Sequence, residues 1–180
     1  MTVQKTIQIG NPILRTKCSE VTFPLSDDVR SLVVDLTDTM RAAGLVGLAA
    51  PQLGVNARVF VLEIPEREDR ERKESELFVC INPVIVRYAD NIVYGNEGCG
   101  SIARGQLFGS VPRPEWSEIE YVDLQGDVQK RRLEGLHSVV ALHEIDHLDG
   151  ILFLDRMDDP KELFDSSQYK HAPQEADVSE

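Results

Sequence analysis

At 180 residues, the chain has the length of a single domain and is long enough to bury a hydrophobic core. Apolar residues make up 42% of it and charged residues 28%, which is ordinary for a globular protein. The net charge of −12 argues against non-specific binding to nucleic acid, whose phosphates would repel the chain, and no apolar run approaches the roughly 20 residues of a membrane span.

The first predicted helix follows Ser26, a residue type that caps helix N-termini. Asp27 and Asp28 favour the first turn, and Gly44 provides a stop. The apolar positions between them recur with the spacing of one helical face, which predicts burial of that face: Val29, Leu32, Val33, Leu36 and Met40.

Two strands are predicted next, at residues 57–64 and 78–86, because both segments are rich in β-branched and aromatic residues. We expect Asn82-Pro83 to interrupt the second strand, since proline cannot donate to a strand ladder. The highly charged stretch 65–76 between them predicts a solvated loop.

Residues 119–124 and 128–135 flank Gln125-Gly126-Asp127, which predicts a β-hairpin. A second helix is predicted from about Gly135 to His147, and the last ten residues are expected to be disordered. Several strands around two helices, without regular β-α-β alternation, predict an α+β fold.

The second helix carries the pattern H-E-x-x-H, with His143, Glu144 and His147. Residues four apart share one helix face, so both imidazoles can reach a single metal ion. A hydrolytic metal site usually takes three protein ligands, and a known longer pattern adds a histidine downstream of a glycine. That pattern matches as far as Gly150 but has Phe153 at the histidine position, so we expect the third ligand to come from upstream.

Cys99 is the upstream candidate, because it lies in EGCGS, residues 97–101, between two glycines that let the backbone approach a ligand closely. A thiolate with two imidazoles is a sound ligand set for a divalent transition metal. The other cysteines, Cys18 and Cys80, are predicted to be small buried hydrophobic residues.

A third motif, GLAAPQ at residues 47–52, follows the first helix and carries the amide of Gln52. In this order the three motifs resemble those of peptide deformylase, whose pattern is G-x-G-x-A-A-x-Q, then E-G-C-x-S, then H-E-x-x-H. The likeness covers most of the chain, from GNPILR (10–15) through VPR (111–113) to residues 143–158. It implies a single α+β catalytic domain over residues 1–165, with antiparallel or mixed sheets around the helix that carries H-E-x-x-H, followed by a flexible acidic tail at 166–180.

The resemblance implies that Cys99, His143 and His147 hold the metal, with water at the fourth position. From first principles, a ligand set of one cysteine and two histidines favours zinc, whose electron shell is closed. The resemblance instead implies ferrous iron as the native ion, with zinc, nickel or cobalt as replacements.

The resemblance also implies the roles of the remaining site residues. Glu144 is the expected general base and acid, and the side chain of Gln52 and the backbone N–H of Gly100 are the expected oxyanion donors. The implied pocket for the methionine side chain is lined by Val46, Gly47, Leu136 and Val140. The implied reaction removes the N-formyl group from formyl-Met of nascent polypeptides and releases formate.

Two positions depart from the family pattern. Leu45 replaces the first glycine of the opening motif, and Gly100 stands where leucine is usual. The stretch after Cys99 is also two residues longer than is common, around 103–110. Because glycine offers no side chain to cover a substrate, we expect Gly100→Leu to tighten the binding of formyl-Met peptides.

N-formylmethionyl peptides are the expected partners, met near the ribosome exit region, with no direct binding to nucleic acid or membrane. The odd count of three cysteines suits a reducing compartment, and the N-terminal sequence has no signal core. We therefore expect the cytoplasm, or an organelle if a presequence has been removed.

Two alternatives stay open at this point. One is a zinc endopeptidase, disfavoured by Phe153 and by the upstream cysteine. The other is a deformylase-like protein that binds metal or N-formyl peptides without turnover, disfavoured by the retained Glu144.

Overall fold

The computed structural model describes residues 3–64 and 76–171, which form two antiparallel sheets and two α-helices. The helices are α1 (Asp27–Ala42) and α2 (Leu136–Leu148). The strands are β1 (Gly47–Ala49), β2 (Val59–Leu62), β3 (Phe78–Tyr88), β4 (Ile92–Gly98), β5 (Leu107–Pro114), β6 (Trp116–Val122), β7 (Val128–Glu134) and β8 (Phe164–Asp165). This is the predicted α+β class.

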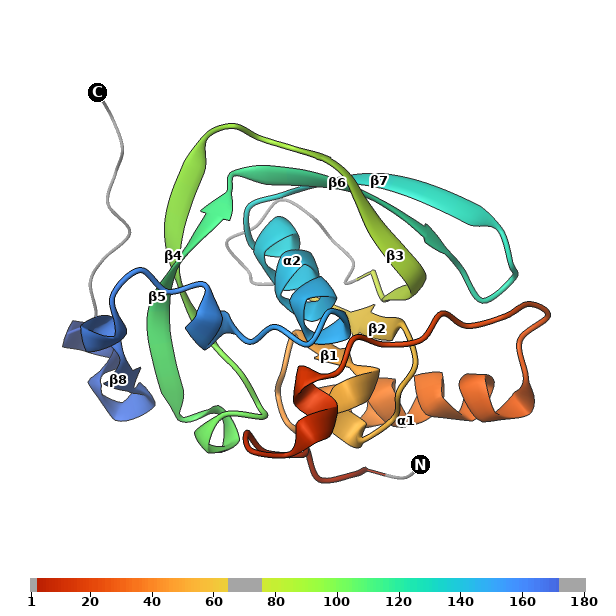
Figure 1. Ribbon diagram of the computed structural model, residues 1–180, viewed down its shortest axis with the longest axis horizontal. Helices are drawn as coiled ribbons and strands as arrows, with labels where there is room; N and C mark the ends of the chain where they lie inside the picture. The colour runs from red at the N-terminus through yellow and green to blue at the C-terminus, as the bar shows by residue number, and fades with distance from the viewer. Residues whose placement is uncertain (1–2, 65–75, 172–180) are drawn as a thin grey trace.

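The first sheet has five strands in the order β1-β2-β3-β6-β7, and the second has three in the order β4-β5-β8. Figure 1 shows β3 running over the top of the molecule and turning into β4, so that the chain passes from one sheet to the other there. The α2 helix lies at the centre, beneath β6 and β7 and beside β5, and α1 lies below it. No helix within the described ranges is both long and apolar enough to cross a membrane.

The α1 helix confirms the predicted start, end and buried face. The Ser26 hydroxyl accepts a hydrogen bond from the Val29 N–H, and Gly44 follows the helix with a φ of +65°. The predicted stripe packs into a core cluster with β1 and β2, and four of its five members are buried: Leu32, Val33, Leu36 and Met40.

The predicted break of the strand at Asn82-Pro83 is wrong, because β3 continues through these residues as one strand. The pairing of β3 with β6 instead shifts its register between Ile81 and Val84. Asn82 has a φ of 52°, and its side-chain amide accepts from the Val21 N–H and donates to the Val21 carbonyl, both at 2.8 Å. The ladder is thus irregular where proline cannot donate, and the Asn82 side chain ties this part of β3 to the segment before α1. The predicted hairpin forms as β6 and β7.

The α2 helix is buried nearly all round, which is typical of a helix at the centre of a core rather than at its surface. It packs against β1, β2, β5, β6 and β7. A site on residues 140–148 of α2, all of which are buried, is therefore enclosed by both sheets.

The predicted charged loop at 65–76 falls, apart from Glu76, outside the described residues, and so do residues 172–180 of the predicted tail. The start of that tail is folded, because residues 166–171 form the 3₁₀ helix η6 (Ser166–His171) and Tyr169 packs edge-on against Phe108. The division of the chain at residue 165 stays a prediction.

Candidate functional site

The two histidines of α2 meet the turn that follows β4. His143 and His147 lie one helical turn apart, and Cys99 comes directly after the last residue of β4. Their ligand atoms all lie within 4.8 Å of one another, with Cys99 Sγ 3.1 Å from His147 Nε2. All three side chains are buried. The two histidines of the motif and the cysteine predicted as third ligand therefore form one enclosed cluster.

This donor set fits a divalent transition metal. Burial lowers the pKa of His147 well below its usual range, so its imidazole is neutral, which is the form that binds a metal. The Nδ1 atom of His143 lies 2.8 Å from a carboxylate oxygen of Glu97, which leaves Nε2 as the nitrogen for a ligand bond. With a cysteine thiolate, the three residues make up a site for one metal ion.

Gln52 points its amide toward this cluster. It lies in the 3₁₀ helix η2 (Ala50–Leu53), directly after β1, and is almost fully buried. Its Oε1 accepts from the Ala49 N–H at 2.8 Å, and its Nε2 lies 3.4 Å from Cys99 Sγ. The first bond fixes the orientation of the amide, so its N–H group faces the metal cluster.

Glu144 is buried beside the histidines, and its Oε2 has no hydrogen-bond partner among the described residues. Burial, the largest influence, raises its pKa to about 7, with the charge of Glu97 adding to the effect and His143 opposing it. A carboxyl group with a pKa near the working pH can both take up and return a proton.

The strand β1 lies directly against this face of α2. A Cβ built on Gly47 would come within 2.5 Å of Glu144 Oε1 and 2.7 Å of Val140 Cγ1, so any other residue here would have to displace these side chains. Val140 and Leu136 precede Glu144 at four-residue intervals on the same helix face, and Leu136 is 42% exposed. The neighbouring Val46 is partly buried against the core cluster that contains Val140. Gly47 thus lies against Glu144 and Val140, and the assignment of Val46 and Leu136 to the same pocket stays a prediction.

Gly100 follows Cys99 and is buried. Its carbonyl accepts from the Thr6 hydroxyl at 2.9 Å and from Gln8 Nε2 at 2.8 Å. Its N–H makes no hydrogen bond to any residue that the structure describes, and so it is available to a bound molecule.

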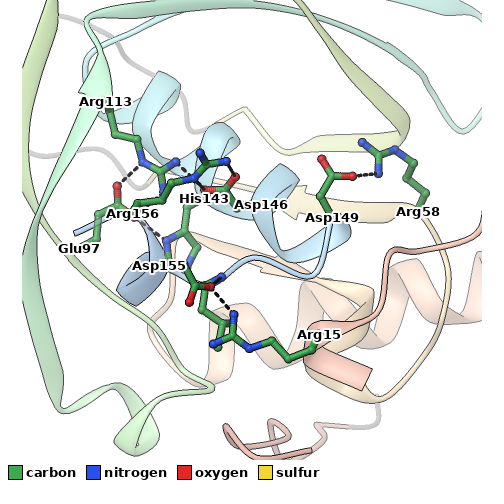
Figure 2. Close-up of polar contacts among 10 residues, drawn as sticks. Arg15, Arg58, Glu97, Arg113, His143, Asp146, Asp149, Asp155 and Arg156 are labelled. Carbon is green, nitrogen blue, oxygen red and sulfur yellow. Dashed lines mark hydrogen bonds and ion pairs between the residues drawn. The ribbon is translucent and has the colours of Figure 1, made fainter. Parts of the chain in front are cut away.

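A network of charged residues, all buried except Arg156, supports His143 (Figure 2). Glu97 accepts two hydrogen bonds from Arg113, at 2.6 and 3.0 Å, besides its contact with His143. Arg113 also donates to Asp146 at 2.6 Å, and Asp146 accepts from Arg156 at 2.7 and 3.1 Å. All four of these residues lie in quoted segments, Glu97 in EGCGS, Arg113 in VPR, and Asp146 and Arg156 in residues 143–158, but only the fold brings them together.

The pKa of Glu97 reflects this environment. Burial is the largest single influence and opposes its ionisation, but the hydrogen bonds from Arg113 and His143 outweigh burial and lower the pKa to about 2. Glu97 is therefore a carboxylate at neutral pH, and a carboxylate can accept from the ring N–H of a ligand histidine and orient it.

Phe153 stands where a metalloprotease of the longer pattern would place a third histidine. It is buried and its ring stacks on His143, with ring centroids 6.3 Å apart and planes inclined by 21°. Phe153 thus packs behind a histidine of the cluster and supplies no ligand atom, which removes the basis for the endopeptidase alternative.

Comparisons with known proteins agree with this geometry. Residues 3–163 match the family model of polypeptide deformylase. A peptide deformylase of Roseiflexus sp. (strain RS-1) is 42% identical over 180 residues, which cover 93% of this chain and 96% of that protein.

Two solved structures are also similar. The Met-Ala-Ser-bound class I type b peptide deformylase of Acinetobacter baumannii has a TM-score of 0.78 and 30% identity, covering 87% of this chain and 99% of that one. The deformylase of Synechococcus elongatus in complex with actinonin has a TM-score of 0.76 and 33% identity, covering 87% and 81%. The chain therefore belongs to the polypeptide deformylase family, and it is a metal-binding hydrolase.

Proposed function

We propose that this deformylase hydrolyses the N-formyl group of peptides that begin with formylmethionine, using the site between β1, the turn after β4 and α2. One observation carries the proposal: a cysteine and two histidines converge in a buried cluster beside a carboxyl group, Glu144, that lacks a partner among the described residues. A metal held by Cys99, His143 and His147 would supply, when bound, a Lewis acid that activates water.

Glu144 is proposed as the group that moves the proton. It takes a proton from the attacking water and returns it to the departing amine, so that formate and a free peptide N-terminus are released. Its burial and its pKa of about 7 support both halves of this role. Gly47 also supports this role, because a side chain at position 47 would occupy the space next to β1 where Glu144 Oε1 lies.

Gln52 and Gly100 are proposed to stabilise the negative charge that develops on the formyl oxygen. The Gln52 amide is held by Ala49 with its N–H toward the cluster, and the Gly100 N–H has no partner among the described residues. Donors that are fixed before the reaction lower the barrier without reorganising, and losing one typically costs about 2.7–4 kcal/mol.

The methionine side chain is proposed to lie in a pocket formed by Val46, Gly47, Leu136 and Val140. Three of these are apolar side chains: Val140 lies one helical turn before Glu144, Val46 packs against the core cluster that contains Val140, and Leu136 is 42% exposed. The Met-Ala-Ser peptide in the Acinetobacter baumannii deformylase shows that a structural relative binds a peptide beginning with methionine.

Ferrous iron is the native ion that we propose, with zinc, nickel and cobalt as replacements. A thiolate with two imidazoles suits all four ions, and the family resemblance favours iron. Metal analysis of protein purified without oxygen tests this proposal, and zinc as the only ion under those conditions would contradict it.

Nascent chains expose their N-termini at the ribosome exit region, and we propose that the enzyme meets its substrates there. The proposed location is accordingly the cytoplasm, or an organelle that begins its proteins with formylmethionine. Cosedimentation with ribosomes that carry formylated nascent chains tests the encounter.

The function is tested by measuring formate release from formyl-Met-Ala-Ser, with acetyl-Met-Ala-Ser and an internal peptide bond as controls. Formate release confined to the formylated peptide is expected. Glu144→Gln should keep its metal but lose about 10²–10⁴ in rate, the usual worth of general acid–base catalysis. Metal binding by the wild-type protein without formate release would instead support the alternative of a binding protein.

A further inference from the structure

The N-terminal segment at residues 6–9 lies across both loops that carry the proposed oxyanion donors. The Ile7 N–H donates to the Gln52 carbonyl, and the Ile9 N–H donates to the Ser101 carbonyl, each at 2.8 Å. The segment is thus anchored by its backbone to η2 on one side and to the turn after Cys99 on the other.

Gln8 lies between these two anchors and holds the turn with its side chain. Its Nε2 donates to the Gly100 carbonyl at 2.8 Å, while its Oε1 accepts from the Arg104 N–H at 3.0 Å. The Thr6 hydroxyl donates to the same Gly100 carbonyl at 2.9 Å. One amide therefore bridges two peptide groups of the turn that lie four residues apart.

The backbone held by Gln8 is in a conformation that needs support. Ala103 and Arg104 have φ values of 46° and 55°, a left-handed conformation that residues with a Cβ rarely adopt. Such strain persists only where the surroundings hold it. Because Gln8 accepts from the Arg104 N–H, it stabilises this turn directly.

A hydrogen bond within the turn sets the direction of the Gly100 N–H. The Ile102 N–H donates at 2.9 Å to the carbonyl of Cys99, which belongs to the same peptide group as the Gly100 N–H. Ile102 lies between the two peptide groups that Gln8 holds. Glycine has no side chain to restrict its rotation, so the orientation of this N–H depends on such bonds.

We propose that Gln8 is a positioning residue for catalysis: its side chain clamps the turn at residues 100–104 and thereby aims the Gly100 N–H at the developing oxyanion. The proposal rests on the proposed function of Gly100. Gln8 acts through the turn and does not itself touch the substrate.

The kinetic test compares Gln8→Ala with Gln4→Ala in the full, zinc-loaded chain. Gln4 is a matched control, because it is the same residue type just before this segment but its side chain donates to Asp35 at 2.8 Å, away from the turn. For Gln8→Ala we expect kcat for formyl-Met-Ala-Ser to fall about 10-fold with KM nearly unchanged, since a misdirected donor weakens the transition state selectively. Gln4→Ala should leave both constants nearly unchanged.

Thr6→Val provides a second variant in case Gln8→Ala does not fold. It removes the hydroxyl donor to the Gly100 carbonyl and the longer contact, 3.3 Å, by which the hydroxyl accepts from Gln8 Nε2, but it keeps both bonds of Gln8 to the turn, so we expect a smaller decrease, about 3-fold, again in kcat.

A second readout does not depend on turnover. In protein labelled with ¹⁵N-glycine, the Gly100 amide signal should broaden and exchange faster in Gln8→Ala, while the signal of Gly126 in the β6–β7 hairpin stays as in wild type.

An unchanged kcat in Gln8→Ala, or an equal loss in Gln4→Ala, would overturn the clamp. Absence of formate release from the wild-type protein would instead count against the proposed function, and the Gly100 amide signal would still decide whether Gln8 holds the turn.

Discussion

The side chain of Leu45 occupies the space beside Gly100. A Cβ built on the glycine would come within 3.1 Å of Leu45 Cδ1, which is tight for a single added carbon. Leu45 itself packs against the core cluster of α1 and β1. The two residues that depart from the family pattern, Leu45 and Gly100, are therefore neighbours. The larger side chain at position 45 fills space beside the missing side chain at position 100.

This contact changes the expectation for Gly100→Leu. The sequence suggested that a leucine at 100 would cover the substrate, but Leu45 already takes part of the room. We expect Gly100→Leu to lower the free energy of unfolding by about 1–3 kcal/mol, the usual cost of overpacking. Combining it with Leu45→Ala should recover part of that loss, with a coupling of about 0.5–3 kcal/mol in a double-mutant cycle. Urea denaturation measures all four proteins, and strictly additive effects would contradict the contact.

Metal content separates Cys99 from the other two cysteines. Cys99→Ser should lose metal, because a hydroxyl ionises far less readily than a thiol and is a harder ligand. Cys18→Ser and Cys80→Ser should keep it, since both residues lie in the core cluster away from the ligand group. Burial raises the pKa of Cys18 to about 11, which keeps that thiol protonated at neutral pH. Equal metal content in all three variants would remove Cys99 from the site.

The metal cluster could be predicted because each part of it is local in sequence. His143 and His147 are one helical turn apart, and the glycines around Cys99 mark a close approach of the backbone. Helix α1 and the β6–β7 hairpin were predictable for the same reason, since capping and turn residues act over a few positions.

The support of the cluster could not be predicted from the sequence. Glu97, Arg113 and Asp146 come from β4, β5 and α2, and their bonds exist only once the second sheet packs against the central helix. The clamp by Gln8 depends in the same way on contacts over more than 90 positions. Such pairings follow from tertiary packing, on which periodicity and spacing carry no information.

The buried network predicts a large difference between two arginines. Arg113→Met leaves the carboxylates of Glu97 and Asp146 buried with one cationic partner fewer, and breaking a buried ion pair typically costs about 3–5 kcal/mol. Arg15→Met is the matched control, because the pair of Arg15 with Asp155 is 45% and 40% exposed and such pairs contribute about 0–1 kcal/mol. Urea denaturation of the metal-loaded proteins gives both values. A loss in Arg113→Met no larger than in the control would show that the network contributes little.

Acid should weaken the fold through Glu97. Its pKa is lowered from 4.5 to about 2, so the unfolded chain takes up the proton first as the pH falls. The stability linked to this shift, on the order of 3 kcal/mol, is fully present above pH 4.5 and is lost as the pH falls towards 2.

Glu97→Gln has no such proton to bind and should therefore be less stable than wild type at pH 6. The gap between the two proteins should close as the pH falls to 2.5. Unfolding free energies of chelated samples exclude any contribution from metal release, and carboxyl groups common to both proteins cancel in the difference. A gap that stays constant from pH 6 to 2.5 would mean that Arg113 and His143 do not hold Glu97 in its ionised form.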